Sequence, residues 1–386
     1  MEQLINKYAD KTVAHGLAEP GAPLIGGLDD ELVWNRPSPS IATLEQVFAE
    51  LNINSLLFCR PKEPYASIVD YLARHAAGAI YPGDTETRTF LHDLPVIDHF
   101  DAADIVGALQ RRKCAIIPDK GIITFGTVSP EQAFVVFSSV LFACFVKFHA
   151  DALTENRAGA IDTKRLHLLR QIIPLYPPLP SSPPSLDPGP FGSESQIHQA
   201  MAQAGELTVE YKLVDSFFGN ISYCTKDILY ISQTGSSMDE LPGYIDACPL
   251  DGSSSTGLTA SSELSAHLRV ITQTNKRAIL HGHPKFPVIL SLDCDEASCE
   301  FAGECHLRCP KDRRIQTVPI ISGEVGSGPH GLSKSLPPAL EKHPSAIVYG
   351  HGLFTTGKID YNDALANMLE IERLCRDEYL KRVGLT

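Results

Sequence analysis

The sequence is poor in positive charge and in long apolar runs, and it lacks a leader-like N-terminus. Against 46 acidic residues it has 33 lysines and arginines, so its net charge is −13. A surface of this charge repels phosphate backbones, which argues against nucleic-acid binding. The first residues, MEQLINKYADKTVAHG, lack the basic and apolar regions of a signal peptide, so we expect a cytoplasmic protein.

The longest apolar run, Ala133 to Val146, is too short to span a bilayer. It favours a buried or interface helix, and we expect no membrane partner. Apolar residues nonetheless make up 43% of the 386 residues, which is enough for sizeable cores. This length is comfortable for two domains.

A proline-rich stretch, residues 176–193, marks the clearest boundary. Prolines remove backbone donors and favour extended chain, so the stretch is predicted to be a semi-rigid linker. It separates an N-terminal domain, residues 1–175, from a C-terminal domain, residues 194–386.

The two domains resemble each other in two segments. Lys113–Phe134 parallels Ser345–Leu365, each with an apolar strand, a glycine turn, a second strand and a helix. Leu56–Leu72 aligns with the segment that ends at Leu292, and both contain Pro-Lys. We therefore predict tandem copies of one domain.

Two histidines, His281 and His283, follow a short apolar run in AILHGH. Side chains two apart in a strand share a face, so both imidazoles can project together, and imidazole suits Zn²⁺. His351 lies in a glycine-flanked turn after another apolar run, and Glu263 lies in the first turn of an expected helix. Ordinary surface or core histidines are the alternative, and we interpret His267 as a core histidine.

Four segments in the same order resemble the class II aldolase/adducin family, which includes L-fuculose-phosphate aldolase and L-ribulose-phosphate 4-epimerase. They are Ser216–Tyr223, Ile228–Gly235, Thr259–Leu268 together with AILHGH, and Ile347–Gly357. The resemblance implies an α/β fold, an α/β/α sandwich around a central, mostly antiparallel sheet, present here in two tandem copies.

The resemblance also implies a divalent metal, Zn²⁺ in the first place, on His281, His283 and His351, with Glu263 as fourth ligand or catalytic base. It implies a substrate phosphate pocket made of Asn220, Thr234, Gly235, Ser261 and Ser262. Backbone N–H groups and hydroxyls at a helix start can hold an anion in this way. In the N-terminal copy, Phe58, Arg60 and Lys120 stand at the histidine positions, so we expect that copy to be degenerate.

The implied reaction is that of a metal-dependent lyase, an aldolase. It would cleave or form a carbon–carbon bond in a small, phosphorylated hydroxy-ketone through a metal-bound enediolate. Epimerase, dehydratase or decarboxylase chemistry at the same site is the alternative, and so is a non-enzymatic, adducin-like interaction protein. Glu324 and Tyr223 are candidates for the acid, with a solvated loop position as the other reading of each.

Four cysteines, Cys294, Cys299, Cys305 and Cys309, fall within sixteen residues. In a reducing compartment such density indicates a second metal, Zn or Fe–S, with disulfides and free thiols as alternatives. The spacing matches neither a zinc-ribbon nor a ferredoxin pattern. As family members form rings with sites between neighbours, we also expect a homo-oligomer, a dimer or higher, acting on a small sugar-phosphate-like substrate.

Overall fold

The computed structural model describes residues 1–214, 217–253, 258–296 and 298–385. The first of the four family-like segments begins at Ser216, which lies outside these residues. The chain divides into two compact units, which we call unit 1, Met1–Tyr176, and unit 2, Pro177–Thr386. Each is a mixed α/β unit with its own sheet, and each is described by itself.

Unit 1 is built around a five-stranded antiparallel sheet in the order β2-β1-β3-β7-β6, with a short β4-β5 hairpin beside it. Its elements are α1 Glu2–Ala14, β1 Leu24–Leu28, β2 Leu32–Trp34, α2 Ile41–Glu50, β3 Ser55–Cys59, α3 Tyr65–His75, β4 Ala79–Ile80, α4 Thr85–Leu91, β5 Leu94–Pro95, α5 Ala102–Leu109, β6 Cys114–Ile117, β7 Gly121–Gly126, α6 Pro130–Arg157, α7 Thr163–Ile172 and the 3-10 helix Ile173–Leu175.

Helix α6 contains the apolar run noted in the sequence. At 28 residues it is long and apolar enough to cross a membrane by length and composition alone. However, 83% of its most apolar window is buried inside the protein. It packs on β7 and β3, and therefore serves as the central helix of unit 1.

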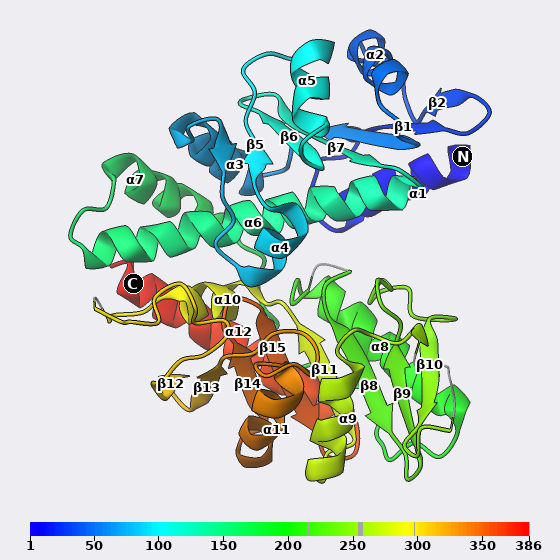
Figure 1. Ribbon diagram of the computed structural model, residues 1–386, viewed down its shortest axis with the longest axis vertical. Coiled ribbons are helices and arrows are strands. Elements are labelled where there is room, and N and C mark those ends of the chain that lie inside the picture. Colours follow the sequence, from blue (N-terminus) through cyan, green and yellow to red (C-terminus); the bar gives the residue numbers. More distant parts are fainter. Residues whose placement is uncertain (215–216, 254–257, 297, 386) are drawn as a thin grey trace. The chain divides into compact units, whose positions relative to one another are not determined.

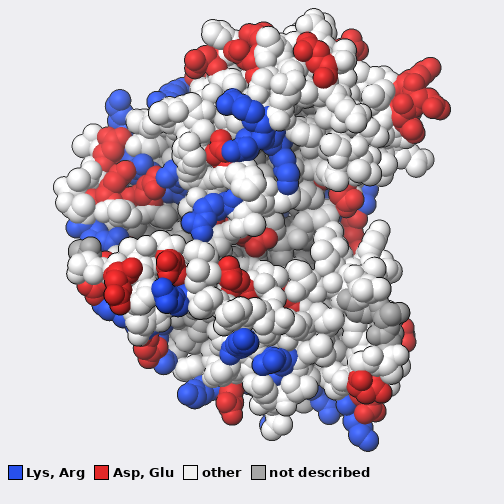
Figure 2. Space-filling view, in the orientation of Figure 1, with Lys and Arg blue, Asp and Glu red and all other residues white. Residues whose placement is uncertain are grey.

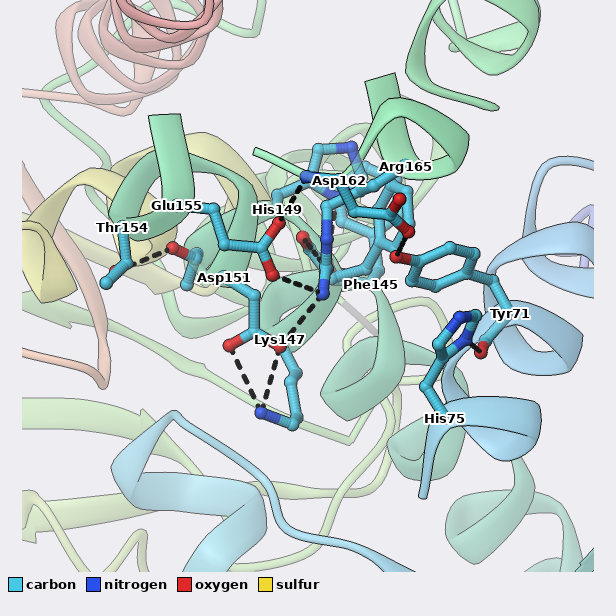
Figure 3. Close-up of polar contacts among 12 residues, drawn as sticks. Tyr71, His75, Phe145, Lys147, His149, Asp151, Thr154, Glu155, Asp162 and Arg165 are labelled. Atoms are coloured by element: carbon cyan, nitrogen blue, oxygen red, sulfur yellow. Dashed lines mark hydrogen bonds and ion pairs between the residues drawn. The ribbon is translucent and has the colours of Figure 1, made fainter. Parts of the chain in front are cut away.

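A buried polar network fixes α7 to α6 (Figure 3). The guanidinium of Arg165 is 2.9 Å from the carboxylate of Glu155 and 3.7 Å from that of Asp151, and it also donates to the carbonyl of Phe148 at 3.0 Å. Only 6% of Arg165 is exposed. Removing a charge from water at this depth is costly unless it is paired, so these contacts set the position of α7.

Unit 2 contains an eight-stranded sheet in the order β10-β9-β8-β11-β15-β14-β13-β12, antiparallel except for the β13–β14 pair. Its elements, shown in Figure 1, are α8 Glu194–Glu210, β8 Asn220–Cys224, β9 Ile228–Ser232, β10 Ile245–Pro249, α9 Leu264–Gln273, β11 Ala278–Gly282, α10 Lys285–Leu292, β12 Arg313–Ile315, β13 Val318–Ile321, α11 Leu332–Lys342, β14 Ser345–Val348, β15 Gly352–Gly357 and α12 Asn362–Arg382.

Helices pack against the sheet of unit 2 through a shared apolar core. Helices α9 and α11 place Val270 and Leu336 against Ile279 of β11 and Phe354 of β15. Helix α12 packs on β15 and β11. Because strand side chains alternate between faces, residues two apart from Ile279 on β11 also face α9.

The two sheets share one strand order. β9-β8-β11-β15-β14 of unit 2 follows the same path as β2-β1-β3-β7-β6 of unit 1. The registers also agree: Phe58 of β3 pairs with Ile123, three residues before the end of β7, and His281 of β11 pairs with Phe354, three residues before the end of β15. In both units a helix of ten residues, α2 or α9, precedes the third of these strands.

The proline-rich segment lies on unit 2 and packs against helix α12. The side chain of Asn362 accepts a hydrogen bond from the amide of Leu186 at 2.9 Å and donates one to its carbonyl at 3.3 Å. Arg373, also on α12, donates to the carbonyl of Pro180 at 2.6 Å. The sequence predicts a linker here, and in the structure the extended chain is held by side chains of the second unit.

Candidate metal centre

Three histidines predicted from the sequence converge in unit 2. The Nε2 atom of His281 lies 3.1 Å from that of His283 and 3.2 Å from that of His351. The three potential ligand atoms all lie within 4.8 Å of one another, and all three side chains are buried. Together with Glu263 they form what we call the histidine centre.

The local backbone explains how these rings meet. His281 lies near the end of β11, and His283 directly follows the strand, so two imidazoles lie at one end of it. His351 follows a turn in which Gly350 adopts φ of 60°, and this turn joins β14 to β15. At Gly352 a Cβ atom would lie 2.6 Å from Cδ2 of His283 and 2.8 Å from Cε1 of His281. Only glycine leaves room there for both rings.

Glu263 faces the three rings from the start of α9. Its Oε1 lies 3.2 Å from Nε2 of His351, and its Oε2 lies 3.5 Å from Nε2 of His281. Asn220, at the start of β8, donates to Oε2 at 2.7 Å. Only 3% of Glu263 is exposed.

The charges of the centre follow from burial and hydrogen bonding. Burial lowers the pKa of His281 to about 4 and that of His283 well below its usual value, so both rings are neutral at pH 7. Burial raises the pKa of Glu263, but His281, His351 and Asn220 together outweigh this effect and hold the pKa below its usual value. The centre therefore combines an ionised carboxylate with the neutral imidazoles of His281 and His283.

The tautomer of His281 is set by the backbone. Its Nδ1 lies 3.1 Å from the carbonyl oxygen of Leu353, which can only accept a hydrogen bond. Nδ1 therefore carries the proton, and Nε2 presents a lone pair toward the other two rings.

Two phenylalanines that sequence reasoning missed stack on rings of the histidine centre. Phe354 of β15 stacks on His281 with ring centroids 3.9 Å apart and planes 10° apart. Phe218 stacks on His283 at 5.5 Å and 5°. The sequence did contain a signal for Phe354. If the apolar runs of β11 and β15 pair as adjacent strands, Phe354 lies opposite His281.

His267 is fully buried on α9, as expected of a core histidine. Its Nδ1 lies 2.7 Å from the hydroxyl of Ser222 on β8, and its ring meets Phe354 edge-on at 6.0 Å. The predicted helix containing Glu263 begins at Leu264, so Glu263 occupies the N-cap position, and Ser261 accepts from its amide at 3.3 Å.

The proposed phosphate-binding residues fall into two groups. An isolated antiparallel bridge between Gln233 and Ala260 puts Thr234 opposite Thr259 and Ser261 opposite Ser232, so the backbone carries Thr234 and Gly235 away from Ser261 and Ser262. The hydroxyl of Thr234 donates to the carbonyl of Ala260 at 2.9 Å, and Gly235 has φ of 72°. Asn220, in contrast, is directed at Glu263 and joins the histidine centre.

The two candidate acids are placed differently. Glu324 lies exposed on the loop after β13, the solvated position given as its alternative. Tyr223 is fully buried on β8, and its hydroxyl donates to the carbonyl of Ile359 at 3.0 Å. Tyr223 pairs with Ala278, which lies at the far end of β11 from His281. The interpretations of Tyr223 as the acid and as a solvated loop residue are therefore both wrong.

The four clustered cysteines, Cys294, Cys299, Cys305 and Cys309, are half-buried. Among the described residues, none of them belongs to a group of three or more converging metal-ligand atoms. Cys299, Cys305 and Cys309 carry free thiols, and Cys305 donates weakly to the carbonyl of Phe301 at 3.8 Å.

The equivalent corner of unit 1 has other chemistry. Phe58 is fourth in β3 as His281 is fourth in β11, and its ring packs against Phe100 with centroids 4.8 Å apart and planes tilted by 40°. Arg60 forms an ion pair with Asp70 at 2.9 Å, and Lys120 lies over the ring of Phe100. A separate group in unit 1, His99 with two aspartates, lies at the surface.

Comparison with known proteins places a family match on unit 2. Residues 199–379 match the family described as Class II Aldolase and Adducin N-terminal domain. These residues include all four members of the histidine centre.

Three solved structures resemble part of the chain. L-fuculose-1-phosphate aldolase from Thermus thermophilus is 25% identical, and the match covers 50% of this chain and 96% of that chain at a TM-score of 0.40. YgbL from Escherichia coli is 18% identical over 48% of this chain and 90% of that chain, with a TM-score of 0.40. A sugar-phosphate aldolase from Thermotoga maritima is 18% identical, and the match covers 50% of this chain and 97% of that chain at a TM-score of 0.35. No curated protein matches the chain.

Proposed function

Because residues 199–379 of this chain belong to the class II aldolase and adducin family, we propose that unit 2 is a metal-dependent lyase. It cleaves or forms a carbon–carbon bond in a small phosphorylated hydroxy-ketone. The histidine centre is its metal site, and Zn²⁺ is the metal that three imidazoles and one carboxylate suit best.

The observation that carries this proposal is the convergence of a buried carboxylate and three buried histidines at one point. Glu263 is buried, and His281 and His283 have pKa values that leave them uncharged at pH 7. A buried carboxylate without a positive partner costs several kcal/mol. A divalent cation bound between Glu263 and the histidines removes that cost and uses the lone pair of His281. The residues of the histidine centre therefore fit a divalent metal.

A bound divalent cation would supply electrophilic stabilisation of the negative charge that develops on the two oxygens of an enediolate. The chain's own residues do the rest. Asn220 holds the carboxylate of Glu263 in one orientation through its 2.7 Å hydrogen bond. Glu263 moves the proton at the reacting carbon. Phe354 and Phe218 fix the planes of two imidazoles.

The substrate's phosphate has a place beside the start of α9. Thr234 follows the bridged residue Gln233, Ser261 follows its partner Ala260, and the hydroxyl of Thr234 reaches the carbonyl of Ala260 at 2.9 Å. Hydroxyls and backbone N–H groups hold an anion without a cationic side chain. This arrangement supports a phosphorylated substrate in a protein with a net charge of −13.

We propose further that unit 1 is a degenerate copy of the same domain. The shared strand order and the matching registers of β3–β7 and β11–β15 support the duplication. A hydrophobic ring and two basic side chains at the histidine positions cannot form the same metal site. Catalysis is therefore assigned to unit 2 alone.

Metal analysis of the purified chain, with and without His351→Ala, tests this function. We expect about one zinc per chain, lost in His351→Ala, because one missing imidazole opens the ligand set. His330→Ala, which removes an exposed histidine elsewhere in unit 2, is the matched control and keeps its metal. The loaded protein should release an aldehyde from at least one of a panel of phosphorylated ketoses. A metal-free wild type, or equal metal in both variants, contradicts the proposal.

A further inference from the structure

A cavity in unit 2 lies at the end of β8, β11 and β15 that is farther from the histidine centre. Its volume is about 420 Å³, and four cationic residues line it: Lys226, Lys276, Arg277 and Lys358. They come from three separate loops that follow β8, precede β11 and follow β15. We call this the lysine cavity.

The positive charges of the lysine cavity are not neutralised within the described part of the chain. No ion pair and no side-chain hydrogen bond is described for any of the four cationic groups. Cys224 and Asn275 are among the other lining residues, and none of the lining residues is acidic. The neighbouring Asp227 lies outside the lining. Four like charges in one pocket repel one another, so the cavity favours a multivalent anion.

A second basic cavity in the same unit provides a contrast. It measures about 440 Å³ and includes Arg308, Lys311 and Lys334. There Arg308 is paired with Glu304 at 3.0 Å, and Lys311 is paired with Glu296. Figure 2 shows acidic and basic side chains on both units, mixed in some places and gathered by sign in others. Two of the three cations of that cavity are thus paired with carboxylates, whereas no such pair is described for the cations of the lysine cavity.

The lining also has an apolar part. Leu250, Ile271 and Ile359 contribute to it, and Ile359 is 44% exposed. Threonine hydroxyls add uncharged polar groups: that of Thr274 accepts from the amide of Lys276 at 3.3 Å. A ligand that fits this lining carries several negative charges on one side and an apolar portion on the other.

We propose that the lysine cavity binds a small organic polyphosphate, a molecule with two or three linked phosphates and an apolar group. The volume is in the range of small-molecule sites. Four cations match the three to four charges of such a ligand. A nucleic acid would meet the repulsion of an acidic protein over the rest of its length.

This site is distinct from the proposed metal site. β8 runs from Asn220 to Cys224, so one end of the strand meets Glu263 and the other lines the cavity. β11 and β15 likewise connect the two places. Four residues at about 3.3 Å each separate the ends by roughly 13 Å, which is too far for one phosphate group to serve both.

Calorimetric titration of the full-length chain with inorganic tripolyphosphate tests the proposal. We expect one binding event per chain, weakened as NaCl rises from about 50 to 200 mM because salt screens exposed charges. In Lys276→Gln/Lys358→Gln the Kd should rise about a hundredfold, since each charged contact contributes about tenfold. The control Lys311→Gln/Lys334→Gln removes the same charge from the other cavity and should change Kd less than about threefold.

Three outcomes would overturn it: no binding to the wild type, an equal loss of affinity in both double variants, or loss of binding in His351→Ala. The last would place the anion at the histidine centre. Retention of binding in His351→Ala supports the lysine cavity whether or not that variant has lost its metal, so this proposal and the proposed function fail separately. Adenosine diphosphate should bind more tightly than inorganic diphosphate because its base can cover the apolar part.

Discussion

Gly352 shows how single residues determine the candidate centre. It is the first residue of β15, the strand that pairs with β11, and a methyl group there would enter the space of two imidazole rings. Its neighbours are ring atoms fixed by stacking on Phe354 and by the Leu353 carbonyl, so they have little freedom to move aside. The geometry of the histidines therefore depends on a residue that binds nothing itself.

The variant Gly352→Ala should reduce the zinc content at least tenfold, because the added Cβ displaces His281 and His283 from a common point. Metal per chain, measured by mass spectrometry of the purified protein, checks this. Gly107→Ala on α5 is the control: nothing lies within 4 Å of its added Cβ, and alanine favours a helix. Full zinc occupancy in Gly352→Ala would show that the rings adapt.

His149 gives unit 1 a dependence of stability on pH. It is fully buried, and burial lowers its pKa to about 3. Between pH 3 and 6.5 the unfolded state binds a proton that the folded state does not, so stability falls as pH falls below 6.5. We expect a loss of about 1.5 kcal/mol between pH 6.5 and pH 5.

Urea unfolding of unit 1 at several pH values measures this loss. His149→Phe removes the titrating group and should flatten the profile over this range, whatever its effect on absolute stability. His167→Gln, which changes an exposed histidine on α7, should keep the wild-type slope. An unchanged slope in His149→Phe would assign the pH dependence to other groups.

At the scale of elements, side-chain pairs decide how helices sit on each other. Helix α7 has only ten residues and few buried apolar side chains, namely Leu169 and Ile172. Its contact with α6 therefore relies on Arg165, which meets two carboxylates and a carbonyl of the longer helix.

Replacing Arg165 with methionine should destabilise unit 1 by about 2 kcal/mol. It leaves Asp151 and Glu155 without their partner, although both are about one-third exposed, so the cost lies below that of a fully buried pair. Lys147→Met removes the partly exposed pair with Asp151 and should cost about 0.5 kcal/mol or less. Denaturant unfolding compares the two, and equal losses would contradict the special role of Arg165.

At the scale of the whole molecule, two units of one strand order differ in chemistry. Unit 2 has three histidines and a glutamate where unit 1 has a phenylalanine and basic groups. A ligand that binds only one unit stabilises only that unit.

Scanning calorimetry should therefore separate the units. Removing metal with a chelator should lower the melting temperature of one transition and leave the other in place, since metal binding free energy becomes folding free energy only in unit 2. His351→Ala should melt at the chelated position and should not respond to the chelator. A shift of both transitions, or of neither, would contradict a single metal site in unit 2.

Much of this could be predicted from the sequence because it depends on spacing along the chain. AILHGH puts two imidazoles at one strand end whatever the rest of the protein does, and a glycine-flanked His351 after an apolar run predicts a turn. The parallels between Lys113–Phe134 and Ser345–Leu365 reflect the same local order of strand, turn and helix. Residue types at fixed offsets are properties of the chain itself.

Other features depended on which elements pack together, and spacing does not contain that information. Tyr223 shares a strand with Asn220, but three residues of rise carry it to the opposite end, next to Ala278. The stacking of Phe354 on His281, the hydrogen bond from Asn220 to Glu263 and the gathering of four cations in the lysine cavity each join segments distant in sequence. The sequence alone determined which groups were available, and only the tertiary structure decided which of them meet, because strand pairing and burial set the distances.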